Sequence, residues 1–128
     1  MMKQIHLHMQ SIPIYTPAGH SLFAAGNFNN WKTGDEHFRF KKNADGTFSL
    51  RFETDLSVIE FRCNRGNWQL AEGDEYAKPN PVRSVLLSGD KNIIPVHISS
   101  WIDFADEHLQ HTASENVLVI AHDFLSRN

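Results

Sequence analysis

Cysteine is almost missing from the sequence: Cys63 is the one cysteine among 128 residues, so the chain can form no internal disulfide. Small secreted domains use disulfides in place of a large core, and that class of protein is therefore excluded. A basic excess is missing too, because twelve Lys and Arg stand against fifteen Asp and Glu, for a net charge of −3. Without positive charge to hold a phosphate backbone, nucleic acid is not expected as a partner.

Long apolar runs are missing as well. No stretch approaches the roughly 20 apolar residues that a membrane-spanning helix needs, so no membrane is expected as a partner. Polar side chains interrupt every apolar stretch near the N-terminus (Gln4, His6, His8 and Gln10), which removes the apolar centre of a signal peptide. Together with the single cysteine, this pattern predicts a cytoplasmic location.

Motifs for catalysis and cofactor binding are absent. The sequence has no G-x-S-x-G elbow, no phosphate-binding loop, no G-x-G-x-x-G and no H-E-x-x-H. We therefore expect a protein that is not an enzyme and that needs no cofactor. Among the eight histidines, His6 and His8 lie two residues apart, on one face of a predicted strand. Because no third ligand follows at a suitable spacing, the pair is interpreted as part of a solvated face, and no metal site is predicted.

What the chain does have is an alternation of apolar and polar residues with a period of two. The alternation runs through residues 3–10, 36–42, 47–53, 57–64 and 92–99. Residues 22–25 add a short apolar run, residues 43–46 (NADG) have the composition of a hairpin turn, and no amphipathic helix is found. Cys63 falls on an apolar strand face and is interpreted as a small buried hydrophobe. The pattern predicts an all-β protein, an immunoglobulin-like β-sandwich of about seven to eight antiparallel strands.

The alternating pattern ends at Trp101, whose place at the end of an apolar strand predicts a core position. The expected domains are therefore a sandwich at residues 1–101 and a C-terminal tail or connector at residues 102–128. Residues 102–114 are polar and irregular, whereas residues 116–120 (NVLVI) form one more short strand-like run. Because this run is too apolar to stay exposed, we expect the tail to add to a sheet edge, in the same chain, a homodimer or a partner domain.

Two of the three tryptophans stand outside any apolar strand pattern. Trp31 follows residues 26–30 (GNFNN), and Trp68 follows residues 65–67 (RGN). A ring in a polar loop exposes apolar surface unless it packs or binds something. A sugar presents C–H faces that stack on such a ring and hydroxyls that bond to polar neighbours. From the residues alone two interpretations stay open: a sugar-binding platform, or two rings that cap the end of the core.

Residues 26–31 (GNFNNW) resemble the G-x-F-N-x-W signature of glycogen- and starch-binding modules. These are carbohydrate-binding module families 48 and 20, which include the glycogen-binding domain of the AMP-activated protein kinase beta subunit. Within residues 3–100 the resemblance continues in order: residues 59–62 resemble the E-Y-K-F strand, residues 66–68 the G-x-W turn, and residues 86–94 the late loop ending in N-N-I-I. It implies a non-catalytic module that binds an α-1,4-linked glucan such as starch or glycogen.

The resemblance also implies a set of carbohydrate-binding residues: Trp31, Trp68, Arg62, Leu87, Lys91 and Asn92. The two tryptophans match the pair on which the family stacks glucose units. Arg62 matches a lysine that hydrogen-bonds sugar hydroxyls, and Leu87 matches a leucine that packs against the glucan. Lys91, with Asn92 next to it, matches an asparagine of the late loop. Arginine for lysine and lysine for asparagine are departures from the family pattern, and they bear on which sugar is bound.

A second resemblance concerns three charged residues, Arg65, Glu72 and Arg83. Together with residues 63–68 they resemble modules that precede bacterial esterase domains, and residues 111–117 resemble the connector into the esterase. In such modules the arginine and glutamate serve the fold or the domain interface, which is the role expected here. The alternative function is a protein–protein interaction or regulatory module of the same fold whose sugar site has drifted, such as a remnant of an esterase N-terminal domain.

Overall fold

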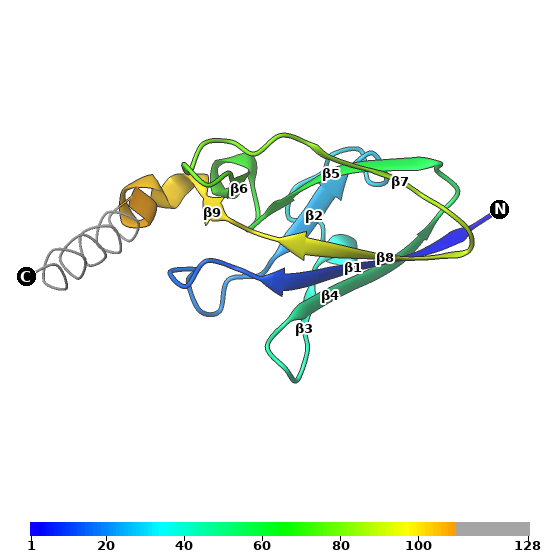
Figure 1. Ribbon diagram of the computed structural model, residues 1–128, viewed down its shortest axis with the longest axis horizontal. Helices are drawn as coiled ribbons and strands as arrows, with labels where there is room; N and C mark the ends of the chain where they lie inside the picture. The colour runs from blue at the N-terminus through cyan, green and yellow to red at the C-terminus, as the bar shows by residue number, and fades with distance from the viewer. Residues whose placement is uncertain (110–128) are drawn as a thin grey trace, which may run out of the picture.

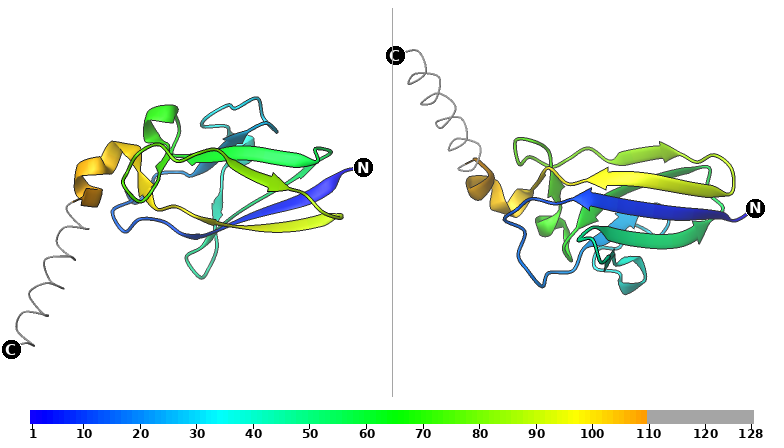
Figure 2. Two further views of the ribbon diagram at one scale, coloured as in Figure 1. Left: turned by 45° about the horizontal axis from the view of Figure 1, so that its top comes forward. Right: turned by 60° about the horizontal axis from the view of Figure 1, so that its bottom comes forward.

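The computed structural model describes residues 1–109 of the chain. Two sheets pack face to face: one has four strands in the order β3-β4-β1-β8 and the other three in the order β2-β5-β7 (Figure 1). The left view of Figure 2 shows these two layers one above the other. A two-stranded sheet, β6-β9, lies at the end of the sandwich opposite the N-terminus. The prediction of an all-β sandwich is confirmed.

The four-stranded sheet consists of β1 (Lys3–Ser11), β3 (Lys41–Lys42), β4 (Phe48–Thr54) and β8 (Lys91–His97). β1 pairs antiparallel with β4 but parallel with β8, so the sheet is mixed and not wholly antiparallel as expected. Ile5, Leu7 and Met9 point from β1 into the core, and each is at most 2% exposed. Because side chains alternate along a strand, His6 and His8 point to the outer face of this sheet.

The three-stranded sheet consists of β2 (Phe23–Gly26), β5 (Val58–Asn64) and β7 (Arg83–Leu86). β5 lies in the middle and runs antiparallel to both neighbours. Ile59, Phe61 and Cys63 face the core and are 0% exposed, which confirms the interpretation of Cys63 as a buried hydrophobe. Burial raises the pKa of the Cys63 thiol well above its usual value, so the thiol stays protonated. Arg62, between them, lies on the outer face.

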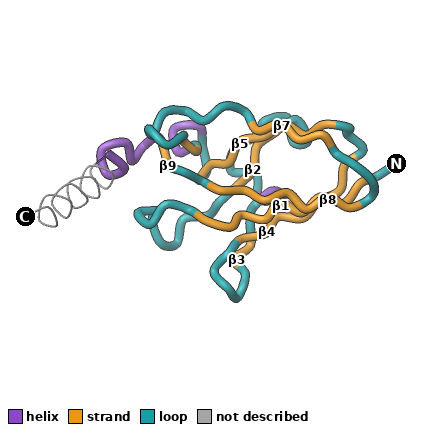
Figure 3. Tube along the Cα trace, viewed as in Figure 1, coloured by secondary structure: helices purple, strands orange, loops and turns teal. Residues whose placement is uncertain are grey.

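Short elements complete the fold, and apart from η1, which packs near the middle of the sandwich, they gather at the end near β9 (Figure 3). They are β6 (Glu72–Gly73), β9 (Ser100–Trp101) and the 3₁₀ helices η1 (Glu36–Phe38), η2 (Trp68–Leu70) and η3 (Ile102–Phe104). Trp101 is 0% exposed, as predicted, and residues 105–109 after η3 are helical where irregular chain was expected. The predicted run at residues 116–120 lies outside the described residues. Within residues 1–109, none of the helices has the length and apolar character needed to cross a membrane.

The strand predicted at residues 36–42 is wrong for its first half. Asp35 caps η1 instead, because its carboxylate accepts a hydrogen bond from the His37 amide at 3.1 Å. The 3₁₀ turn directs Phe38 toward Phe28 and Phe52, with ring centroids 5.0 and 5.2 Å apart. Aromatic packing and a capping carboxylate therefore outweigh the alternating pattern here.

Candidate functional site

Trp31 lies on the loop of residues 27–34, and the residues before it fasten that loop to β5. Gly26 begins it, and no larger residue fits there because a Cβ atom would lie 2.2 Å from the carbonyl oxygen of Glu60. Asn27 donates a hydrogen bond to the Val58 carbonyl and accepts one from the Glu60 amide, both at 3.0 Å. The first half of the G-N-F-N-N-W motif is therefore a structural device that anchors the loop.

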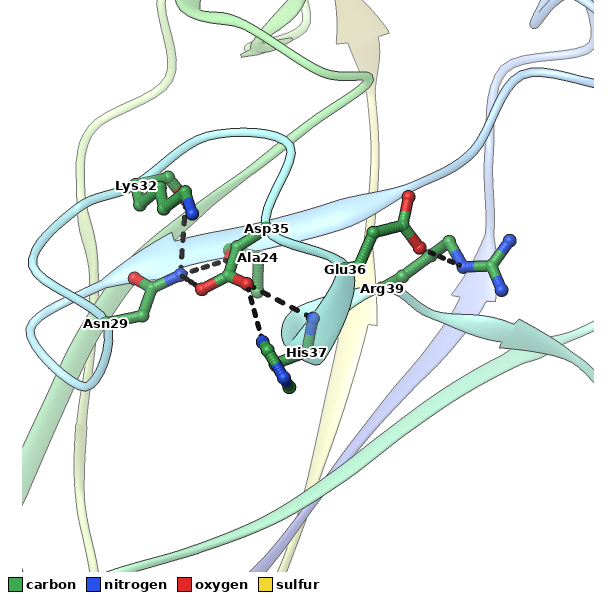
Figure 4. Close-up of polar contacts among 7 residues, drawn as sticks. All are labelled: Ala24, Asn29, Lys32, Asp35, Glu36, His37 and Arg39. Carbon is green, nitrogen blue, oxygen red and sulfur yellow. Dashed lines mark hydrogen bonds and ion pairs between the residues drawn. The ribbon is translucent and has the colours of Figure 1, made fainter.

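Asn29 holds the loop from inside (Figure 4). Its Oδ1 accepts a hydrogen bond from the Gly26 amide at 2.9 Å. Its Nδ2 donates to the Lys32 carbonyl at 3.1 Å and to Asp35 Oδ2 at 3.3 Å. One side chain thus ties both ends of the turn together, which explains why an asparagine stands two residues before the tryptophan.

The turn that this asparagine braces has an unusual backbone. Asn30 and Trp31 have φ angles of 55° and 58°, in the left-handed region that a bulky side chain rarely adopts. The Trp31 amide donates to the Gly26 carbonyl at 2.9 Å, which fixes the strained segment against the end of β2. Strain of this kind persists only where the surroundings hold it, and it concentrates at functional sites.

Asp35 supports the same loop as a carboxylate. Desolvation by burial acts to raise its pKa, but hydrogen bonds from the His37 amide, the Asn29 side chain and the His37 ring outweigh it and hold the pKa below its usual value. Asp35 was not singled out from the sequence as a functional residue. The sequence feature that could have indicated Asp35 is its position as a helix-capping residue directly before Glu36 and His37.

Trp68 is presented by a second braced turn. Gly66 has a φ angle of 132°, and Asn67 caps η2 by accepting a hydrogen bond from the Leu70 amide at 3.1 Å. The two loops meet at a close backbone approach, because a Cβ atom on Gly34 would lie 2.8 Å from the Gly66 carbonyl oxygen. Each turn is indicated in the sequence, by Gly-Asn before Trp68 and by Gly-Asn-Phe-Asn before Trp31. In the structure the two turns meet and form one continuous surface.

The structure brings the two loop tryptophans together as a pair. The ring centroids of Trp31 and Trp68 lie 6.5 Å apart, and the ring planes are inclined by 39°. Trp68 is 39% exposed and Trp31 is partly buried, so neither ring belongs to the closed core. The two rings therefore lie side by side at the surface of the joined turns.

Arg62 lies on the outer face of β5, because its neighbours Phe61 and Cys63 point into the core. Its register partner Ala25 points to the same face and is nevertheless 0% exposed. The loop that carries Trp31 begins at Gly26, next to Ala25, and reaches the turn after β5 at the contact between Gly34 and Gly66. The Nε atom of Arg62 is buried and finds no hydrogen-bond partner among the described residues.

Leu87 does not join the tryptophan pair. Its side chain is 7% exposed and packs in the core between the sheets, while the preceding Leu86 is 76% exposed. The Leu87 amide donates to the Ser57 carbonyl at 2.9 Å, which fixes this inward orientation. Leu87 is therefore removed from the set of residues that contact a bound sugar, because its side chain offers no surface.

Lys91 and Asn92 also lie apart from the pair. Ile94 points into the core, so Lys91, three residues earlier on β8, points to the outer face of the four-stranded sheet, opposite the face of Arg62. Asn92 Oδ1 accepts a hydrogen bond from the Ser88 amide at 2.9 Å, so this oxygen already has a partner. Both residues lie near the start of β5, whereas Trp68 follows its end, and a strand of this length spans about 20 Å.

Arg65 has the structural role that was expected of it. It is 6% exposed, forms an ion pair with Asp103, and its guanidinium carbon lies 5.0 Å from the ring centroids of both Trp101 and Phe104. Stacking and charge together fasten η3 to the sandwich. The described beginning of the predicted tail therefore packs on the fold.

Glu72 and Arg83 form a second buried ion pair. Glu72 is 1% exposed, and its Oε1 accepts from Arg83 Nε at 2.9 Å and from Asn80 Nδ2 at 2.7 Å. Its Oε2 accepts from the Cys63 amide at 3.1 Å. These bonds connect β5, β6 and β7, so the pair also serves the fold.

The histidine pair on β1 has partners other than a metal. His6 Nε2 lies 2.9 Å from Ser49 Oγ, and His8 Nε2 lies 3.2 Å from Thr47 Oγ1. Burial, then Arg51 and His8, lower the pKa of His6, so it stays neutral at pH 7. In the part of the chain that the structure describes, no three His, Cys, Asp or Glu side chains gather as metal ligands would.

The chain matches no protein-family model, and no curated protein matches it. The candidate site consequently rests on its geometry: two tryptophans on braced loops, and Arg62 on the outer face of β5, whose buried Nε has no hydrogen-bond partner within residues 1–109.

Proposed function

We propose that the protein is a non-catalytic carbohydrate-binding module whose platform is the pair Trp31 and Trp68. The observation that carries this proposal is the ring pair itself, with centroids 6.5 Å apart and planes inclined by 39° on the surface. Two such rings offer stacking faces to two neighbouring sugar units, and the inclination suits a chain that curves, as α-1,4-linked glucose does. The ligand class is therefore an α-glucan of the starch or glycogen type.

A shallow platform on one module gives weak binding. We expect a dissociation constant of roughly 10 μM to 1 mM, or about −7 to −4 kcal/mol. Stacking of one aromatic ring on a nucleic-acid base contributes about 1–3 kcal/mol, and we transfer that scale to sugar. At this affinity the loss of either ring abolishes measurable binding.

Arg62 is the polar member of the proposed site, since it lies on the outer face of the strand that leads into the turn of Trp68, opposite Ala25, which precedes the Trp31 loop. Leu87, Lys91 and Asn92 have no place in the proposal for the reasons given above. No group of the described residues is assigned a catalytic role, and the purified protein should hydrolyse neither starch nor aryl esters. A cytoplasmic location stays a prediction from the sequence.

Affinity electrophoresis in gels that contain glycogen or amylopectin tests the proposal. The polysaccharide should retard the wild type, while Trp31→Ala and Trp68→Ala should migrate as they do in plain gels. Tyr76→Ala is the matched control, because this ring is 64% exposed on the segment between β6 and β7 and is not part of the pair. Thermal unfolding should confirm that all variants are folded. A wild type that no α-glucan retards would disprove the proposal.

An interaction module of the same fold is the second candidate, and two exposed apolar side chains favour it. Leu86 on β7 is 76% exposed and Ile93 on β8 is 73% exposed, and both strands are sheet edges. Exposed edges and apolar side chains are features of protein interfaces. If the wild type is dimeric in light scattering and Leu86→Asp makes it monomeric, this second function gains support, whether or not glucan binds.

A further inference from the structure

We infer that the platform prefers glucans that carry an anionic substituent, a phosphate ester or a carboxylate, and that Arg62 binds this group. The inference rests on the proposed glucan-binding function and concerns the charge of its ligand. It starts from the buried Nε of Arg62, which has no hydrogen-bond partner among the described residues.

Arg65 Nε is also buried without a hydrogen-bond partner among the described residues, so Arg62 differs from the other two little-exposed arginines in its charge pairing. Arg65 forms an ion pair with Asp103, and Arg83 forms one with Glu72. Among residues 1–109, no carboxylate forms an ion pair with Arg62, although Glu60 lies two residues away on the same strand face. A guanidinium that is partly removed from water and lacks a counter-charge favours an anion from outside the chain.

The planar shape of the Arg62 guanidinium indicates which kind of anion it binds best. A guanidinium is a planar fork of N–H donors that matches two oxygens of one phosphate or carboxylate group, whereas a sugar hydroxyl offers one uncharged oxygen. Charge-assisted hydrogen bonds are also roughly twice as strong as neutral ones. A substituted sugar unit next to the rings would therefore gain a contact that an unsubstituted glucan lacks.

The same polymer backbone in three charge states tests this inference. Binding is compared for neutral amylopectin, for amylopectin with phosphate monoesters, and for amylopectin oxidised to carboxylates at its primary alcohols. Arg62→Gln removes the proposed contact. Lys91→Gln is the matched control, because it removes the same charge from the opposite outer face of the sandwich.

The wild type and Lys91→Gln should bind at least one anionic polymer about tenfold more tightly than the neutral one, which corresponds to about 1.4 kcal/mol. Arg62→Gln should lose this preference. Because Arg62 belongs to the proposed site, its binding of the neutral polymer through the rings should be weakened but still measurable. The polymer that shows the preference identifies phosphate or carboxylate as the recognised group. Arg62→Lys, which keeps the charge without the planar fork of donors, should retain only part of the preference. It also provides a second test if Arg62→Gln does not fold.

Equal binding of all three polymers by the wild type would overturn the inference and leave the glucan-binding proposal intact. A preference that Lys91→Gln loses as fully as Arg62→Gln would also overturn it, since the attraction would then be diffuse. Failure to bind any of the three polymers would instead refute the glucan-binding proposal itself.

Discussion

Trp101 and the pair of Trp31 and Trp68 are the same residue type in opposite environments. Trp101 is 0% exposed, its Nε1 donates to Thr16 Oγ1 at 2.7 Å, and Arg65 lies over its ring. The paired rings lie in contact range of each other at the surface. Partners within the chain make Trp101 a core residue, and our proposal assigns a ligand to the two rings at the surface.

The backbone conformation also distinguishes Trp101 from Trp31. Trp101 has a φ angle of −117°, which any residue adopts, whereas Trp31 has a φ angle of 58°. The chain therefore keeps a relaxed backbone at Trp101 and a strained one at Trp31, whereas Trp68 lies in the 3₁₀ helix η2 without a positive φ. Strain at a position that the core does not need is a reason to look there for function.

The largest effect is expected for Trp101→Ala. Loss of a buried tryptophan costs about 3–5 kcal/mol in the free energy of unfolding, and here it also removes the ring that stacks on Arg65. Trp68→Ala should change stability by no more than about 1 kcal/mol, because the ring is 39% exposed. Urea unfolding measures both. Equal destabilisation by the two substitutions would show that the pair is core and not platform.

Gly26→Ala should weaken glucan binding, because Gly26 anchors the loop that carries Trp31. The new Cβ atom would lie 2.2 Å from a backbone oxygen, and such overpacking costs about 1–3 kcal/mol. Because the loop that carries Trp31 must shift, glucan binding should fall with stability. Gly19→Ala is the control: its Cβ meets nothing within 4 Å, and although its φ of 85° costs some stability, binding should not change. Normal glucan binding by a folded Gly26→Ala would contradict the anchoring role of this glycine.

The main strands could be predicted because alternation records burial directly. The patterns at residues 3–10, 47–53 and 57–64 became β1, β4 and β5. The pattern at residues 36–42 failed because a capping carboxylate and aromatic packing are tertiary effects that the pattern does not contain. β6 and β9, of two residues each, were missed because so short a strand has no period to detect.

The candidate site could be predicted where local turn chemistry decides it. Trp31 and Trp68 follow Gly and Asn residues that build braced turns, and these turns meet. Leu87 and Lys91 were assigned by resemblance of motif, but the face to which each side chain points depends on strand register, which the resemblance did not provide. Leu87 therefore lies in the core and Lys91 on the opposite outer face.

Acid should loosen the platform before it unfolds the core. The pKa of Asp35 lies below its usual value of 3.8, so its stabilisation of the loop is present above about pH 4 and is lost as the pH falls through the lowered value. The loss of this network should weaken glucan binding about fivefold, or about 1 kcal/mol.

Retardation in amylopectin gels between pH 3 and pH 7 measures this acid effect. Asp35→Asn should bind more weakly at neutral pH and lack the acid dependence. Asp45→Asn is the matched control, because hydrogen bonds from Thr47 also lower the pKa of Asp45, but in the hairpin between β3 and β4. If Asp35→Asn still loses glucan binding at low pH, another titratable group causes the acid dependence.

The smallest expected effect is the difference in stability between glycine and alanine variants, which should have opposite signs at Trp31 and Trp68. At Trp31, with a φ angle of 58°, glycine avoids a steric cost that alanine keeps, so Trp31→Gly should be more stable than Trp31→Ala by about 1 kcal/mol. At Trp68, in the 3₁₀ helix η2, the order should reverse, because glycine gains only flexibility there and costs about 0.5–1 kcal/mol. All four variants should fail to bind glucan, so urea unfolding reports the backbone alone. If glycine is the less stable residue at both positions, the left-handed turn stores no strain, and only the arrangement of the rings distinguishes the platform from the core.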